Sequence, residues 1–154
     1  MNKTIEYYNE ELSKLAGVPC KLTVYYNNAY IDINNNSFYY TKDSEGVDFR
    51  LAIVSSNRTI SHFKLVQFPG CCGICISTGA MVVEDYKNKG IGTLLNKFRQ
   101  DVARHQGYTI LMCTDLDNNV PQKKILDHQG FQHIYQFINK RTNNLLNVSL
   151  LKLD

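Results

Sequence analysis

No stretch of the sequence approaches the roughly 18 consecutive apolar residues that a membrane-spanning helix needs, so we expect a soluble protein with no membrane partner. The net charge of +3 is small, and the lysines and arginines form no basic stripe of the kind that binds nucleic acid. Internal repeats, low-complexity segments and long linkers are missing too. We therefore predict one domain over residues 1–154, because a chain of this length with 44% apolar residues can bury a core of its own.

The five cysteines are an odd number, and the first residues do not form the basic and apolar leader of a secreted protein. Both features predict reduced thiols in a cytoplasmic protein. Cys72 and Cys75 have half of the spacing of a zinc ribbon, yet no second Cys-x-x-Cys or His-x-x-x-His follows. We therefore expect no metal site, and free cysteine is a common small core residue.

The first half of the sequence predicts one helix followed by strands. Apolar residues at helical spacing predict a helix over 4–16, which Gly17 ends. The run from Lys21 to Ile33 predicts two strands joined at Asn27-Asn28, because asparagine tolerates the positive φ that a two-residue turn requires. The asparagines at 34–36 predict a second turn. Three further β-rich runs predict antiparallel strands, at 49–55, 60–68 and 73–83.

The second half alternates between helical and strand-like patterns. Apolar residues on one face predict a helix that starts at Ile91 and ends at Gly107, with Arg99 and Gln100 on its other faces. A buried strand at 108–114 and a loop at 115–119 follow, and then a helix with Pro121 near its first turn and Gly130 just past its end. Two closing strands are predicted at 131–139 and 145–153.

The segment from Lys87 to Gly92, KNKGIG, joins a predicted strand to the helix that follows. A dinucleotide-binding fingerprint would have a third glycine where Leu95 stands, and a P-loop would have its lysine after the glycines, whereas Lys89 precedes them. Both interpretations fail. What remains is a glycine turn that lets successive backbone N–H groups and the helix N-terminus bind an anion such as a diphosphate.

This segment resembles the Arg/Gln-x-x-Gly-x-Gly/Ala signature of the GCN5-related N-acetyltransferases, the GNAT superfamily, with lysine in the first position. Asn119 and the pair Gly130-Phe131 are similar to a second segment of that family, so the resemblance covers residues 76–134. It implies an α+β domain with a mixed, mostly antiparallel sheet flanked by helices, in which strands 4 and 5 splay to hold acyl-CoA. The hairpin-rich N-terminal region, 1–60, differs from the family's usual pair of early helices.

The resemblance implies an N-acetyltransferase that moves an acetyl group from acetyl-CoA to a primary amine of a small molecule, a protein or a modified base. The alternative is a non-catalytic GNAT-fold module that binds acyl-CoA or a partner protein, and a homodimer is compatible with either. A backbone N–H near Val82 would polarise the thioester carbonyl. The residues expected to hold acetyl-CoA are Met81, Val82, Val83, Lys87, Asn88, Lys89, Gly90, Ile91, Gly92, Thr93 and Asn119.

The usual catalytic side chains of the family are replaced in this sequence. Leu126 stands where many relatives have a tyrosine near the CoA sulfur, and Thr78 and Thr114 stand where relatives have glutamates that act as bases. The best support for the non-catalytic alternative is therefore the loss of these three groups. A thiolate is nevertheless a tolerable leaving group, and water can protonate it.

Four other titratable residues remain as candidates for the base. We favour Asp115, because it follows the predicted fifth strand beside the splay, where a carboxylate can take a proton directly or through water. His133 comes second, because an imidazole titrates near neutral pH but the face on which it lies is not fixed by the pattern. Glu84 and Asp117 complete the candidates.

Overall fold

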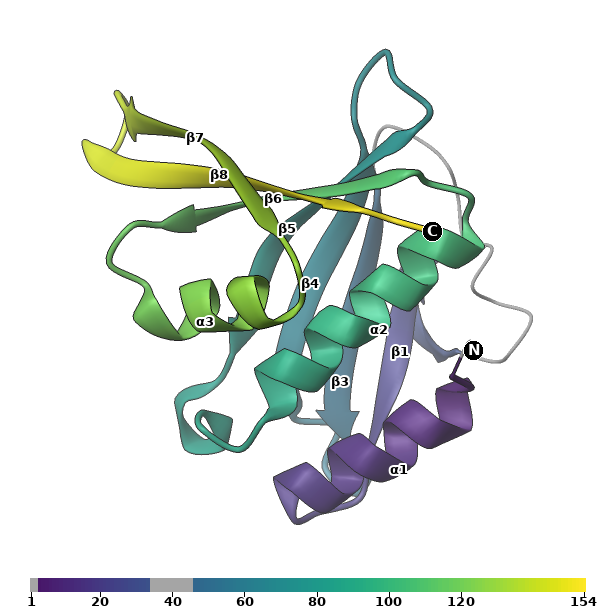
Figure 1. Ribbon diagram of the computed structural model, residues 1–154. Helices are drawn as coiled ribbons and strands as arrows, with labels where there is room; N and C mark the ends of the chain where they lie inside the picture. Colours follow the sequence, from purple (N-terminus) through teal and green to yellow (C-terminus); the bar gives the residue numbers. More distant parts are fainter. Residues whose placement is uncertain (1–2, 34–45) are drawn as a thin grey trace.

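The computed structural model describes residues 3–33 and 46–154, and within them it contains three α-helices and eight strands (Figure 1). The helices are α1 Ile5–Ala16, α2 Ile91–His105 and α3 Val120–His128, with a short 3₁₀ helix at Glu84–Tyr86. The strands are β1 Cys20–Tyr26, β2 Ala29–Asp32, β3 Val47–Ile53, β4 Thr59–Gln67, β5 Ile74–Val82, β6 Ile110–Leu116, β7 Gln132–Asn139 and β8 Asn144–Lys152.

All eight strands belong to one mixed sheet in the order β2-β1-β3-β4-β5-β6-β8-β7. Neighbouring strands are antiparallel except β5 and β6, which run parallel because α2 connects them. Figure 1 shows the three helices in front of the sheet. This is the α+β fold expected from the sequence. Among the described residues, no helix combines the length and apolar content that a bilayer crossing requires.

The N-terminal half of the chain forms the helix and the hairpin that its sequence predicts. The Thr4 side chain accepts a backbone N–H of the first turn of α1, and Gly17 ends this helix with φ 71°. Asn27 and Asn28 have φ 50° and 65°, and they join β1 to β2 in the predicted hairpin. The turn predicted at 34–36 lies outside the described residues.

The core lies between the sheet and the helices, and Phe98 of α2 is at its centre. This ring has no exposed surface, and it makes edge-on contacts with Phe49, Phe63 and Tyr8 at centroid distances of 5.7, 6.0 and 5.1 Å. Burial of one such ring contributes roughly 1.5–3 kcal/mol. These contacts fix α2 against the sheet and against α1, so the first turn of α2 is held in a defined place.

Two expectations differ from the structure. The strand β6 continues to Leu116 where a loop was predicted from residue 115, because Asp115 and Leu116 pair with residues of β8. Arg99 and Gln100 were placed on outer faces of their helix, but only 5% and 7% of their surfaces are exposed. The reason is that α2 packs against α1 and α3 as well as the sheet, so more than one of its faces is covered.

The sheet opens between β5 and β6. Their parallel pairing runs only from Ile74 with Ile110 to Ser77 with Cys113, although both strands continue beyond these residues. Near the opening, β5 contains Gly79 with φ 64°, and its register with β4 shifts. A bulge of this kind bends a strand locally, which turns the end of β5 away from β6. The predicted splay is therefore present.

Candidate functional site

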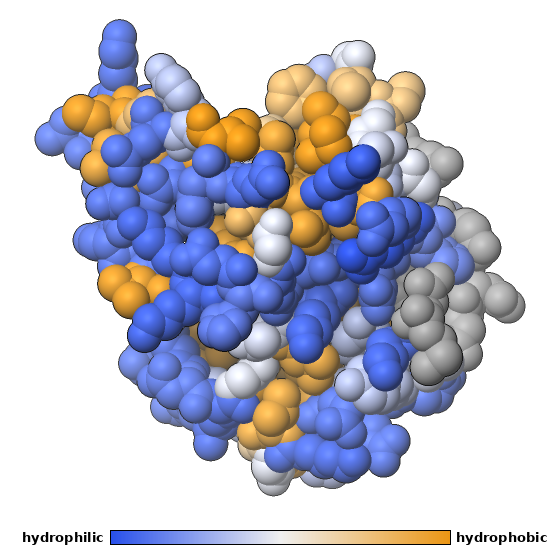
Figure 2. Space-filling view, viewed as in Figure 1, coloured by the Kyte–Doolittle hydropathy of each residue, from blue (hydrophilic) through white to orange (hydrophobic). Residues whose placement is uncertain are grey.

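A cavity of about 510 Å³ lies beside the end of β5, between the N-termini of α2 and α3. Its walls come from β4, β5, the loop after the 3₁₀ helix, and the first turns of the two helices. Figure 2 shows the helix-bearing face as mostly hydrophilic, with apolar side chains visible between the polar ones. The cavity thus joins a turn rich in backbone N–H groups to the opening in the sheet.

The predicted binding residues line this cavity, with the exception of Val83 and Lys89. Val83 lies just after β5, and its N–H donates to the Ile60 carbonyl at 2.9 Å, so it continues the pairing with β4. The predicted residues on the cavity wall are Met81, Val82, Lys87, Asn88, Gly90, Ile91, Gly92, Thr93 and Asn119.

The N-terminus of α2 points unused backbone donors at the cavity. The first intrahelical bond runs from the Leu94 N–H to the Gly90 carbonyl at 3.1 Å, so the N–H groups of residues 91–93 have no acceptor inside the helix. Gly90 has φ 86°, and among the described residues no side chain caps this end. Asn88, with φ 61°, makes the preceding reversal. Together these features give the backbone geometry that an anion site at a helix N-terminus requires.

The first turn of α3 forms the opposite wall. Asn119 caps this helix, because its Oδ1 accepts the Gln122 N–H at 3.3 Å. The two helices approach closely at Gly92, where a Cβ atom would lie 3.7 Å from Cδ1 of Ile125 and 4.0 Å from Cγ2 of Val82. The slot between α2 and α3 therefore stays open because residue 92 has no side chain.

An amide cluster sets the spacing of the two helices. Oε1 of Gln129, just after α3, accepts from the side-chain amides of Asn96 and Gln100 at 2.6 and 2.5 Å. The Gln129 amide in turn donates to the Thr93 carbonyl at 3.0 Å. These bonds cross from α3 to α2 on the side of the slot and explain why Asn96 and Gln100 are buried.

The lysines of the loop are exposed. Lys87 forms an ion pair with Glu84 at 2.9 Å and lines the mouth of the cavity, while Lys89 lies just before Gly90. Charges in such positions attract an anion through solvent, and salt screens them.

Arg99 is a cavity residue that the sequence interpretation missed. Its Nη1 donates to Oγ of Ser77 at 2.7 Å, and its guanidinium lies 5.3 Å from the centroid of the Phe63 ring. Its Nε has no hydrogen-bond partner among the described residues. Burial lowers the pKa of Arg99 to about 10, so it remains a cation at neutral pH. Helical periodicity gave no signal for it, because the pattern counts only apolar residues.

Asp115 lies on β6 just past the last pair with β5. Only 6% of its surface is exposed, and neither carboxylate oxygen has a hydrogen-bond partner among the described residues. Burial raises the pKa of Asp115, and Asn147, His133 and Lys123 oppose that effect. The carboxylate does not line the cavity itself; it lies on the other strand of the splay.

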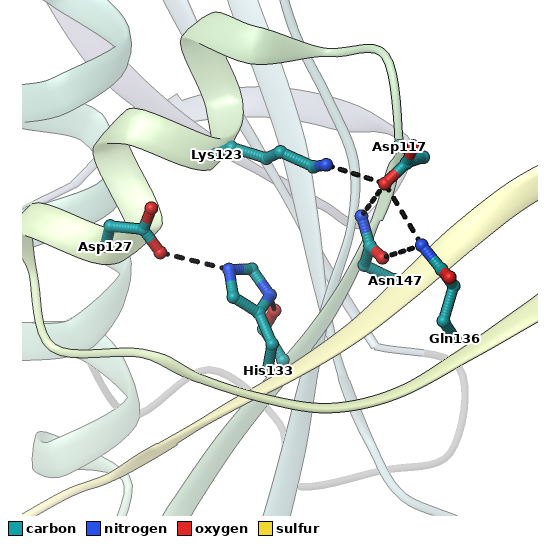
Figure 3. Close-up of polar contacts among 7 residues, drawn as sticks. Asp117, Lys123, Asp127, His133, Gln136 and Asn147 are labelled. Atoms are coloured by element: carbon teal, nitrogen blue, oxygen red, sulfur yellow. Dashed lines mark hydrogen bonds and ion pairs between the residues drawn. The ribbon is translucent and has the colours of Figure 1, made fainter.

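The other three candidate bases already have partners. Asp117 accepts from Lys123, Gln136 and Asn147 at 2.6, 3.1 and 3.3 Å, as Figure 3 shows, and the bond from Lys123 is the main reason that its pKa is lowered. His133 bonds to Asp127 at 3.0 Å and to Ser149 at 2.7 Å, and Glu84 pairs with Lys87. None of the three lines the cavity.

All five cysteines are free thiols. Within residues 3–33 and 46–154, no three His, Cys, Asp or Glu side chains come together as a metal site would require. The cavity itself is lined by backbone donors, Lys87 and Arg99, a set that suits an anionic ligand, while Asp115 lies nearby on β6.

No family model matches the sequence, and no curated protein matches it either. Solved structures do match. An acetyl-CoA-bound GNAT family acetyltransferase from Elizabethkingia anophelis aligns with TM-score 0.64 and 16% identity, over 86% of this chain and 98% of that one. The ribosomal-protein-S18-alanine N-acetyltransferase from Escherichia coli aligns with TM-score 0.65 and 10% identity, over 88% and 94%.

A third structure, an IAA acetyltransferase from Bacillus cereus, aligns with TM-score 0.58 and 16% identity, over 70% of this chain and 78% of that one. The chain thus has the fold of the GNAT acetyltransferases, as the resemblance of residues 76–134 predicted. At these identities the likeness concerns the fold.

Proposed function

We propose that the protein is an acyl-CoA-dependent N-acyltransferase that transfers an acetyl group from acetyl-CoA to a primary amine. The observation that carries this proposal is a cavity that extends from the donor-rich N-terminus of α2 to the end of β5, beyond the residues of β5 that pair with β6. A relative in fold with acetyl-CoA bound supports it.

In this proposal the diphosphate of acetyl-CoA binds to the N–H groups of residues 91–93 at the positive end of the α2 dipole. The pantetheine chain lies along β5, where the residues beyond Ser77 are not paired with β6. Backbone groups of Met81 and Val82 then contact the chain, and an N–H near Val82 polarises the thioester carbonyl. Only main-chain groups are needed for this step, so the unusual side chains of the site do not prevent it.

The transfer needs one proton acceptor. The ammonium group of the acceptor loses one proton to Asp115, directly or through water, and the neutral amine attacks the carbonyl carbon; a C–N bond forms and the C–S bond breaks. The second proton lost by the nitrogen passes through water to the leaving CoA thiolate. We assign the base role to Asp115 because it is buried on β6 just beyond the last residue that pairs with β5 and because this burial raises its pKa. His133 is a weaker candidate, since both of its ring nitrogens are bonded.

The direct test is release of free CoA thiol from acetyl-CoA over a panel of small amines, peptides with free N-termini and lysines, and nucleosides that carry amines. We expect release above the hydrolysis rate with at least one class of acceptor. If calorimetry shows tight CoA binding but no acceptor of the panel gives thiol release, the non-catalytic module is favoured. The replacement of the usual tyrosine and glutamates supports the same alternative. Absence of CoA binding would refute both.

The loop lysines give a further prediction. The double variant Lys87→Ala, Lys89→Ala should bind CoA roughly threefold to tenfold more weakly at low salt, because two exposed charges near the phosphates are lost. The difference should shrink as salt rises. Calorimetry at two ionic strengths measures it, with Lys140→Ala, Lys152→Ala as the control that removes the same charge far from the cavity. Equal affinities for the two double variants at low salt would show that Lys87 and Lys89 do not contact the ligand.

A further inference from the structure

Arg99 is a buried cation for which the described residues provide no anion. It contacts the Ser77 hydroxyl and the face of the Phe63 ring, and no acidic side chain among the described residues forms an ion pair with it. A buried charge without a counter-ion costs several kcal/mol, whereas a methionine of similar length would fill the same space without that cost. A role in packing alone therefore does not explain this residue.

The position of Arg99 relates it to the reacting end of the proposed ligand. It lines the same cavity as Gly92, two turns further along α2, about 10 Å deeper at 1.5 Å per residue. Its Nη1 is bound to Ser77, the last residue of β5 that pairs with β6. Arg99 therefore lies on the wall of the same cavity as Met81 and Val82, beside which the proposed ligand places its acyl group.

We infer that this cavity accepts acyl chains that end in a carboxylate, with Arg99 as the residue that binds the carboxylate and sets the acyl specificity. The inference rests on the proposed binding of acyl-CoA. A guanidinium has five N–H donors in a planar fork, and at least Nε is unused here among the described residues, so it can form charge-assisted bonds to a carboxylate. Short monothioesters of dicarboxylic acids have the required chemistry.

The test compares two probes of the same chain length. Succinyl-CoA has a four-carbon acyl group with a terminal carboxylate, and butyryl-CoA has a four-carbon acyl group without one. Calorimetry without any acceptor should show about tenfold or more tighter binding of succinyl-CoA, the gain typical of a charge-assisted hydrogen bond. Arg99→Met should remove this preference. Ser77→Ala, a smaller change, should reduce it severalfold, because the guanidinium loses its anchor.

The outcomes separate this inference from the proposed function. Equal affinities of the wild-type protein for the two probes, with CoA still bound, would overturn the inference and leave the transferase proposal in place. So would a preference that persists in Arg99→Met or, if that variant does not fold, a preference as large in Ser77→Ala as in the wild-type protein. Faster thiol release with carboxylate-bearing amines together with equal binding of the two probes would assign Arg99 to the acceptor and overturn the acyl assignment. Failure of every CoA ester to bind would refute the proposed function itself.

Discussion

Gly92→Val is expected to abolish detectable CoA binding while the protein stays folded. A Cβ at this position would lie at ordinary van der Waals distance from Ile125 and Val82, so the backbone of α2 tolerates a side chain there. The two methyl groups of valine, however, extend into the slot between α2 and α3 in front of the unused N–H groups. Since the ligand and the side chain would occupy the same space, binding should be lost. Calorimetry with CoA measures the effect, and circular dichroism confirms the fold.

Gly73→Val is the matched control for this substitution. Gly73 lies outside the cavity, and a Cβ there would meet no atom within 4 Å. Gly90→Val should also abolish CoA binding, but it is a less clean test, because φ 86° strains any residue with a side chain and the variant mixes folding with binding. Unchanged CoA affinity in a folded Gly92→Val protein would refute the proposal that the diphosphate binds to the N–H groups of residues 91–93.

The glycine turn at the N-terminus of α2 could be predicted from the sequence because its signals are local. Gly90 and Asn88 adopt positive φ within the six residues of the motif, and the apolar face of the next helix begins directly after it. Each of these features depends on neighbours in the chain rather than on distant contacts. The motif therefore specifies its own conformation, and the cavity forms where the motif predicts it.

Arg99 could not be predicted in the same way. Its burial follows from Ser77 on β5, Phe63 on β4 and the α3 side of α2, which are contributed by segments far apart in the sequence. A pattern of apolar residues at helical spacing identifies one buried face, but a helix packed on several sides buries polar residues too. The burial of Gln100 has the same origin, since its partner Gln129 lies beyond α3.

The place of Asp115 could be predicted from the sequence, but its environment could not. Its place beside the splay follows from the order of the elements, but its environment depends on pairing with Asn147 of β8, thirty-two residues later in the chain. That pairing extends β6 beyond its predicted end and buries the carboxylate. The environment of His133 could not be predicted either. Its place next to Ser149 and Asp127 is determined by the β7–β8 register. Register across strands is a tertiary property that alternation alone does not fix.

Asp115→Asn is expected to lower kcat about a hundredfold or more, in line with typical general-base contributions, and to leave CoA affinity nearly unchanged. The carboxamide keeps the shape of the side chain but cannot accept the proton of the amine. In the wild-type protein kcat/KM should rise with pH through a pKa above the usual aspartate range, because burial favours the neutral acid. In the variant, kcat/KM should not show this rise with pH. The measurement is a pH–rate series with the best acceptor from the amine panel.

Asp117→Asn is the matched control, since Asp117 is two residues away on the same segment but its carboxylate is already bonded to Lys123. It should keep the pH profile, and His133→Ala should have a smaller effect than Asp115→Asn. If all three variants keep both the rate and the profile, proton transfer runs through water or the substrate, and Asp115 has no catalytic role.

Stability distinguishes loss of a base from loss of the fold. The native pKa of Asp115 is raised above its unfolded value, so between these two values the native state binds more protons than the unfolded state. The free energy of unfolding of the wild-type protein therefore falls as pH rises through this window. Asp115→Asn does not ionise, so its Tm relative to wild type should increase from pH 4 to neutral pH, while its activity is at its lowest relative to wild type. A variant that is inactive because it is unfolded would show no cooperative unfolding transition at neutral pH, and this outcome would remove the support for Asp115 as the base.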